Sequence, residues 1–328
     1  MSNLLELASI ILTPTAYSAD TLHCIKPNTA TGDFNFDRNT TSTRVNSSGN
    51  VEALSANLPR IDYTGGTGHI SLEPQSTNLF LNSATLSTQS VTTTAASHTI
   101  SFYGTGSITL SGTHSATING TGANNRVTLT FTPSSGSLNC TVSGTVTNAQ
   151  IEALAFATSY IPTTGAMVTR AADAANSAGS NTLINGGGSG EGVIYAEIAA
   201  FTSNPGIGNI SLSDNSITKR IVIGFGFSAN QFLCSINNGS TFPNFLSFQT
   251  VSDVTAYNKI ALKYKLNDIS LYINGVEVAT DTSSTIPTLQ SLQFDNGFNG
   301  ANQFFGKVKC VAIYKTALTD SQLQCLTS

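Results

Sequence analysis

Two adjacent runs of residues between positions 257 and 280 alternate between large apolar side chains and small or polar ones. A period of two residues is typical of β-strands with one buried face, because successive side chains point to opposite sides of a sheet. The dipeptide Asn274-Gly275 tolerates the positive φ angles of a tight hairpin turn. The segment is therefore predicted to be a β-sandwich meander, a fold that presents loops and a sheet face for binding rather than a buried catalytic pocket. The apolar positions are Ile260, Leu262, Tyr264 and Leu266 in the first run and Ile269, Leu271 and Ile273 in the second.

The composition agrees with an all-β fold. Only 10% of the 328 residues are charged and 40% are hydrophobic, so the chain has enough apolar area to fold. Abundant serine and threonine, with frequent glycine and asparagine, suit strands and turns. The length predicts two or three domains of about 100–200 residues each. The net charge of −4 and the lack of a basic cluster argue against a nucleic-acid partner.

Strand spacing and composition divide the chain into four parts. Residues 1–66 form a first unit, with a short strand at 33–37. Residues 67–170 contain short hydroxyl-rich strands separated by Gly, Ser and Asn, which is typical of a β-sandwich or jelly roll. Residues 171–190 are rich in Gly, Ala and Ser and are predicted to be a linker or an extended strap. Residues 191–328 form a second β-sandwich.

The two ends of the chain carry short signals of their own. Residues 4–12 are apolar, but no basic residue precedes them, so we expect a buried strand or short helix rather than a signal peptide. This stretch is too short to span a bilayer, and no other segment could cross one. At the other end, residues 317–326 are predicted to be a helix, with Thr319 as N-cap and Gln322 completing a capping box.

The cysteines and histidines show no metal-binding pattern. The five cysteines lack CxxC spacing, which argues against a zinc site. Cys140 and Cys310 lie in apolar strand patterns and are predicted to be small buried side chains in reduced form. The sequence leaves open whether Cys310 and Cys325 form a disulfide. The four histidines lie outside residues 191–328 and share no ligand spacing.

No motif indicates an enzyme. Glycosidases need two carboxylates across a sugar bond, and the nearest candidates, Glu191 and Glu197, have no third acid beside them. The chain has no Gly-x-Ser-x-Gly nucleophile elbow. The glycine-rich stretches at 186–188 and 224–227 lack the lysine of a phosphate loop. Arg38, Arg44 and Arg60 lie near Asp33, Asp37 and Asp62 in sequence, and we expect local ion pairs that fix irregular backbone.

Several motifs, taken together and in order, resemble a module of bacteriophage virion proteins. The C-terminal pair of motifs is similar to the closing strand and helix of concanavalin A-like (laminin G-like) domains on phage fibres and spikes. The motifs lie at 40–49, 57–63, 72–79, 150–165 and 169–173, and the C-terminal pair lies at 306–309 and 314–320.

The resemblance implies an all-β virion fibre or spike subunit on the virion surface. Residues 1–66 would anchor it to capsid or tail proteins. A carbohydrate-binding-module-like β-sandwich at 67–170 and the laminin G-like one at 191–328 would bind a host surface glycan, with avidity from many copies. The subunit would be a homotrimer, or a homopentamer at a capsid vertex. The alternatives are a surface-polysaccharide depolymerase spike and a secreted bacterial laminin G-type adhesin.

Two loops of the last unit are the candidate glycan sites. Because the chain has no Trp, Tyr and Phe must supply any aromatic face, with amide and carboxylate neighbours. The three phenylalanines in these loops could instead be core or oligomer contacts. No cofactor is predicted, although Asp295 with Asn296 could help to hold calcium, as in many laminin G-like domains; plain turn chemistry is the alternative. The candidates are Phe242, Asn244, Phe245, Asp295, Asn296, Phe298 and Asn299.

Overall fold

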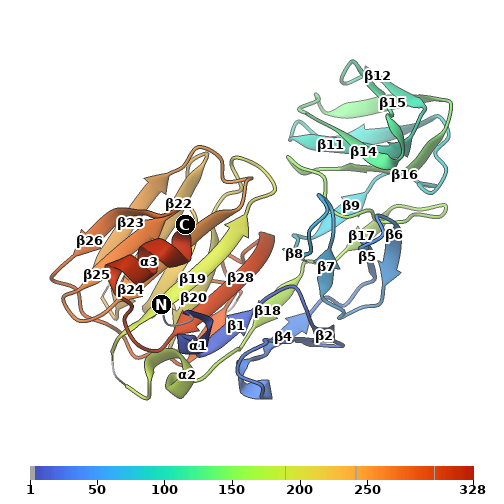
Figure 1. Cartoon of the computed structure of the whole chain (residues 1–328). Coiled ribbons are helices and arrows are strands. Elements are labelled where there is room, and N and C mark those ends of the chain that lie inside the picture. Colours follow the sequence, from blue (N-terminus) through green and yellow to red (C-terminus); the bar gives the residue numbers. More distant parts are fainter. Residues whose placement is uncertain (1–3, 189, 241, 299) are drawn as a thin grey trace.

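The computed structural model describes residues 4–188, 190–240, 242–298 and 300–328. The chain is nearly all β, as predicted, and its described residues hold three short helices. Figure 1 shows a large β-sandwich at the left, a smaller sandwich at the upper right, and N-terminal strands that run between and below them. The helices are α1 (Leu4–Leu7), α2 (Asn181–Asn185) and α3 (Asp320–Thr327).

The large sandwich consists of an eight-stranded and a five-stranded antiparallel sheet. Apolar side chains from both sheets, such as Ile194, Ile223 and Leu262, form one buried core between them. The eight-stranded sheet has the order β26-β25-β24-β19-β28-β8-β7, with β1 also on β28, and the five-stranded sheet has the order β23-β22-β21-β20-β27. The C-terminal strands are β19 (Gly192–Ala199), β20 (Gly208–Ser213), β21 (Lys219–Phe225), β22 (Gln231–Asn238), β23 (Phe245–Thr250), β24 (Asn258–Tyr264), β25 (Ile269–Ile273), β26 (Val276–Asp281), β27 (Ser291–Gln293) and β28 (Gly306–Tyr314).

The predicted meander at 257–280 is confirmed as β24, β25 and β26. The turn residues Asn274 and Gly275 have φ angles of 50° and 82°, as the Asn-Gly signal requires. Leu266 is an exception, because it lies beyond the end of β24 and is exposed. The polar face is also more buried than the alternation suggests: α3 packs over it, and Lys263 forms an ion pair with Asp268 at 2.7 Å.

The first 72 residues supply strands to the large sandwich. Strand β1 (Ile10–Leu12) pairs with β28, and β8 (His69–Leu72) extends the same sheet, followed by β7 (Arg60–Asp62). The predicted strand at 33–37 is confirmed as β4 (Phe34–Asp37). The other strands of this region are β2 (Tyr17–Ser18), β3 (Thr21–Leu22), β5 (Ser42–Val45) and β6 (Val51–Leu54).

The smaller sandwich has a separate core. Its sheets have the orders β10-β15-β12-β13 and β14-β11-β16, and Phe80, Phe102 and Leu138 are among the buried residues between them. Strands β9 and β17 pair below it and lead back toward the large sandwich (Figure 1). The bounds are β9 (Ser76–Asn78), β10 (Gln89–Thr93), β11 (His98–Gly104), β12 (Ser107–Gly112), β13 (Ala116–Asn119), β14 (Gly122–Phe131), β15 (Gly136–Ser143), β16 (Val146–Glu152) and β17 (Val168–Arg170).

The predicted linker at 171–190 contains regular structure. Strand β18 (Ala174–Asn176) pairs with β4, and the backbone N–H of Ala178 donates to Leu292 O at 3.1 Å. Helix α2 follows, with Ser180 as its N-cap. The segment therefore acts as a strap along the large sandwich, because its backbone hydrogen bonds are made to other strands.

A buried network of arginines and carboxylates joins the N-terminal strands to the strap. Arg38 and Arg60 pair with Asp173, while Arg60 and Arg170 pair with Glu73. The expectation of pairs with Asp33, Asp37 or Asp62 is therefore wrong for Arg38 and Arg60, which pair with Asp173 and, for Arg60, also with Glu73. Among the three predicted acids, Asp62 accepts the backbone N–H of Val45 and Thr64, each at 2.8 Å. Arg44 alone pairs locally, with Glu52 at 2.6 Å.

No cysteine forms a disulfide, and only part of the apolar N-terminal stretch is buried. All five cysteines are free; Cys140 is buried as predicted, Cys310 is half-buried, and Cys325 is exposed and unbonded to it. In the apolar stretch 4–12, β1 is buried, whereas helix α1 is not. None of the helices in the described ranges has the length and apolarity needed to span a bilayer.

Candidate functional site

The five-stranded sheet has one side that points away from the core, which we call the outer face. The cross-strand register aligns Ser211 with Val222, and Val222 with Ser235. Side chains along these strands alternate between the two sides of the sheet: Ile210 and Leu212 point into the core, and their neighbours in the strand point outward. The outer face consists of Asn209, Ser211, Ser213, Arg220, Val222, Leu233, Ser235, Asn237, Leu246 and Phe248.

The loop that follows β27 folds over part of the outer face. Asn209 donates from its side-chain amide to Asn296 Oδ1 at 3.1 Å, and Arg220 donates to Asn296 O at 2.8 Å. Ser213 Oγ donates to Gly297 O at 3.0 Å. This loop buries the polar side chains of β20 and leaves the β23 side of the face open.

Polar atoms without partners gather on this face. They are Asn209 Oδ1, Ser211 Oγ, Arg220 Nε and Asn237 Oδ1, which have no hydrogen-bond partner within the part of the chain that the structure describes. Burial also lowers the pKa of Arg220. Because an unpaired buried polar group costs about 1–3 kcal/mol, such a cluster favours ordered water at this position, beneath the covering loop.

Exposed aromatic rings lie at the open side of the face. Phe248 on β23 is 41% exposed and Phe227, in the β21–β22 turn, is 64% exposed; their ring centroids are 5.8 Å apart. Leu246, also exposed, lies two residues before Phe248 on the same strand. An exposed apolar group beside polar side chains is a feature of interaction surfaces. Phe227, Leu246 and Phe248 are called the aromatic edge below.

The predicted loop at 241–245 has mixed outcomes. Phe245 is buried in the core, as the alternative interpretation expected, because the alternation of β23 points it inward. Phe242 is 79% exposed, at the tip between β22 and β23. Asn244 shapes this tip, since its Oδ1 accepts the backbone N–H of Asn238 at 3.0 Å.

The predicted loop at 295–300 is the one that covers the outer face. Asp295 is buried and accepts the backbone N–H of Gly297 at 2.7 Å and of Gly300 at 3.1 Å, which is turn chemistry. Burial raises the pKa of Asp295. Phe298 is exposed, and Asn299 lies outside the described residues.

Both predicted loops lie beside the turn between β20 and β21. Gly239, just before the first loop, donates its N–H to Thr218 O, and Gly297 of the second accepts from Ser213, which precedes the same β20–β21 turn. Both loops therefore border the outer face.

Sequence reasoning missed the aromatic edge. The period-two pattern from Phe245 to Phe248 was a usable signal, because it places Leu246 and Phe248 on the side opposite Phe245. Phe227 carried no signal beyond its place in a Gly-rich turn. Its proximity to Phe248 depends on the pairing of β22 with β23.

Among the described residues, no three His, Cys, Asp or Glu side chains gather in a way that could hold a metal ion. Glu191 pairs with Lys265 at 3.5 Å, and Glu197 lies 4.0 Å from Lys309. The two carboxylates that the sequence put forward for hydrolysis are thus each beside a lysine.

The sandwich geometry agrees with a match to a known family model. Residues 199–324 match the model of the concanavalin A-like lectin/glucanases superfamily. These residues form a concanavalin A-like lectin/glucanase domain. They include the outer face, the aromatic edge and both predicted loops.

The chain is also similar to parts of several solved structures. A leech intramolecular trans-sialidase, complexed with 2,7-anhydro-Neu5Ac, is 19% identical with a TM-score of 0.35, over 42% of this chain and 23% of that one. The Ruminococcus gnavus IT-sialidase CBM40 bound to alpha2,3 sialyllactose is 17% identical with a TM-score of 0.35, over 42% and 83%. The binding domain of botulinum neurotoxin DC, in complex with rat synaptotagmin II, is 12% identical with a TM-score of 0.37, over 48% and 40%. No curated protein matches the chain.

Proposed function

We propose that the concanavalin A-like domain binds a glycan on its outer face. The observation that carries the proposal is the exposed aromatic edge on the open β23 side of the outer face. A sugar has an apolar C–H face that fits an aromatic ring, and hydroxyls that pair with polar side chains. The open face recovers little desolvation energy, so single-site binding is expected to be weak.

We further propose that the chain is a subunit of a phage fibre or spike on the virion surface. The motif order in the sequence supports this role. Residues from four of these motifs, among them Arg60, Glu73, Ser159 and Asp173, take part in one buried network. The subunit would assemble as a homotrimer, or a homopentamer at a capsid vertex, and many copies would give avidity for the host surface.

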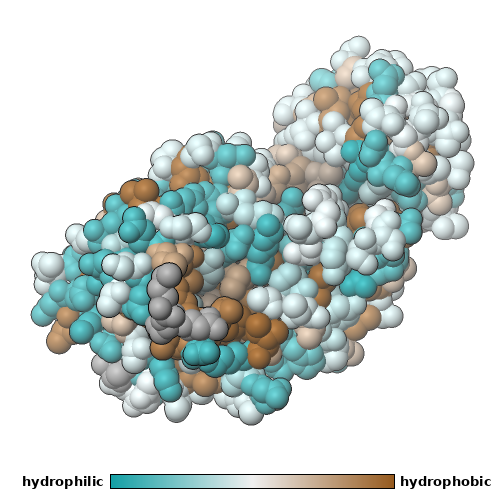
Figure 2. Space-filling model, in the orientation of Figure 1, coloured by the Kyte–Doolittle hydropathy of each residue, from teal (hydrophilic) through white to brown (hydrophobic). Residues whose placement is uncertain are grey.

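Anchoring to capsid or tail proteins would use the N-terminal end. Leu7 and Ile25 are exposed there, and Lys26 Nζ donates to Glu6 O at 2.7 Å, which holds the two segments together. Elsewhere the surface in Figure 2 is mostly white and teal, as expected for a chain rich in Ser, Thr and Asn. The apolar spots near the N-terminus are thus available for a partner protein.

Glycan binding is tested with the purified full chain on an array of bacterial surface polysaccharides. The variant Phe248→Ser should reduce binding at least tenfold, since it removes one ring of the aromatic edge. The control Val276→Ser removes an exposed apolar side chain from the other sheet and should bind like the wild type. Equal binding by both variants would exclude the outer face. Shortened polysaccharide chains after incubation would instead favour the depolymerase alternative.

The virion role has a separate test. Purified particles should contain the chain by mass spectrometry, and native mass spectrometry of the recombinant protein should show a trimer or pentamer. A monomer that is absent from particles would reject this part of the proposal and leave glycan binding untouched.

A further inference from the structure

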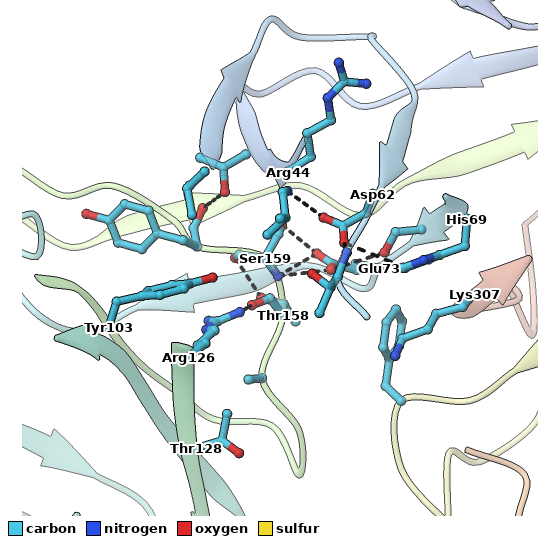
Figure 3. A pocket seen from close by; sticks show the side chains of 18 residues that line it. Arg44, Asp62, His69, Glu73, Tyr103, Arg126, Thr128, Thr158, Ser159 and Lys307 are labelled. Atoms are coloured by element: carbon cyan, nitrogen blue, oxygen red, sulfur yellow. Dashed lines mark hydrogen bonds and ion pairs between the residues drawn. The ribbon is translucent and has the colours of Figure 1, made fainter. Parts of the chain in front are cut away.

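A cavity of about 230 Å³ lies where the two sandwiches and the N-terminal strands meet. Figure 3 shows side chains from all three parts around it. Asp62 and His69 come from the N-terminal strands, Tyr103 and Arg126 from the smaller sandwich, and Phe201 and Lys307 from the large one. We call it the junction pocket. Pockets between domains are common places for ligands.

The carboxylates at the junction pocket are already satisfied. Asp62 accepts two backbone N–H groups, from Val45 and Thr64. Glu73 pairs with Arg60 and Arg170 and accepts from Ser159 Oγ at 2.9 Å. The charge of Glu73 is thus compensated by two arginines, whereas Asp62 is held by neutral backbone groups.

The cations that face the pocket are not compensated in this way. Arg126 donates only to uncharged oxygens, to Thr158 O at 2.7 Å and to Ser101 Oγ at 2.8 Å, and its Nε has no partner within the described ranges. Lys307 Nζ lies 5.8 Å from the ring centroid of Phe201, and no described carboxylate forms an ion pair with it. The charge that remains for a ligand is positive.

The pocket also has ring surfaces and a rigid frame. Phe201 stacks on Phe156 of the smaller sandwich, with ring centroids 5.0 Å apart, so this wall is held from both sides. Tyr103 lies across the pocket from Lys307 in Figure 3. The volume is below the usual range of about 300–1,000 Å³ for drug-sized ligands, so it suits a single sugar unit rather than an oligosaccharide.

We propose that the junction pocket binds one acidic monosaccharide unit, whose anionic group is attracted by Arg126 and Lys307 and whose ring packs beside Tyr103 and Phe201. Arginine and lysine both form strong charge-assisted hydrogen bonds to carboxylate and phosphate. A ligand here contacts all three parts of the chain, so its binding stabilises their arrangement. The site is separate from the outer face and does not depend on glycan binding there.

Calorimetric titration of the full chain tests the proposal, with D-glucuronate, D-glucose 6-phosphate and neutral D-glucose at low ionic strength. At least one acidic sugar should bind and raise the melting temperature, and glucose should not. Binding of glucuronate alone would identify a carboxylate ligand, and binding of the phosphate ester alone a phosphate ligand. Added 0.5 M NaCl should weaken the interaction, because salt screens charge attraction.

Variants assign the binding to the pocket. Lys307→Gln should weaken it by about tenfold or more, as expected for one charge-assisted contact. Lys309→Gln, two positions further along β28 and outside the pocket, should bind like the wild type. Arg126→Gln should also weaken binding; if this variant does not fold, Lys307→Gln decides.

The proposal is overturned if neither acid binds the wild type, or if Lys307→Gln binds as well as Lys309→Gln. The variant Phe248→Ser should bind the acidic sugar as tightly as the wild type does. Loss of acidic-sugar binding at the junction pocket can therefore be distinguished from loss of glycan binding on the outer face.

Discussion

Arg38 donates to the carboxylate of Asp173 over 3.0 Å, and both side chains are completely buried. The second oxygen of Asp173 pairs with Arg60 and accepts the backbone N–H of Glu73 at 2.8 Å. One carboxylate of the strap thus holds two arginines and the end of β8. Such a group is costly to remove, because both arginines would stay buried without it.

The substitution Asp173→Ala is expected to lower the free energy of unfolding by about 3–5 kcal/mol, the cost of breaking a buried ion pair. Urea unfolding followed by circular dichroism measures it. The matched control is Asp37→Ala on β4, whose side chain is exposed, and we expect a change within about 0.5 kcal/mol. If Asp173→Ala lowers the free energy of unfolding no more than Asp37→Ala does, the network adds no stability.

Stability is also expected to fall in acid through Glu73. Burial alone would raise its pKa, but Arg60, Arg170 and Ser159 outweigh burial and lower the pKa from 4.5 to about 2. A carboxyl group with a lowered pKa in the folded state stabilises the protein above its unfolded pKa, and this contribution is lost as the pH falls. The melting temperature should therefore drop between pH 4.5 and about 2.

The variant Glu73→Gln should be less stable at neutral pH and should show a flatter acid limb than the wild type. Glu277→Gln, which changes an exposed residue of β26, should keep the wild-type profile. Parallel acid limbs for the wild type and Glu73→Gln would contradict the assignment. Differential scanning calorimetry at several pH values gives all three curves.

Local patterns in the sequence were reliable where neighbours in the chain are neighbours in space. The alternation at 257–280, the Asn274-Gly275 turn and the capping box at Thr319 all depend on contacts between nearby residues. The inward position of Phe245 belongs to the same class, since the alternation of one strand decides it. This pattern was present, although the candidate list did not use it.

Contacts between distant residues could not be predicted in this way. Arg38 and Asp173 are 135 positions apart, and nearby Asp33 and Asp37 were therefore the expected partners. The pairing of β8 with β28 likewise joins segments that are far apart in the sequence. The junction pocket results from such contacts, and the aromatic edge depends on how β22 pairs with β23, so neither follows from one sequence without a fold.

The cap of α3 offers a local test of stability. Thr319 Oγ1 accepts the N–H of Gln322 at 3.4 Å, and Gln322 Oε1 accepts the N–H of Thr319 at 2.9 Å. Replacing an N-cap threonine with alanine costs about 1 kcal/mol. Thr319→Ala should lose this amount in urea unfolding, and Ser321→Ala, inside the helix and exposed, should lose far less. Equal effects would assign the loss to the helix surface rather than to the cap.

The docking of the strap on the large sandwich rests in part on Tyr264, whose hydroxyl donates to Ile184 O at 2.9 Å. Tyr264→Phe leaves that carbonyl without its partner and should cost about 1 kcal/mol, the typical value for one hydrogen bond. Tyr272→Phe is the control, because no hydrogen bond of its hydroxyl is found in the described residues. Hydrogen exchange should also quicken at residues 181–185 in Tyr264→Phe alone. Unchanged exchange there would show that the strap is held without this bond.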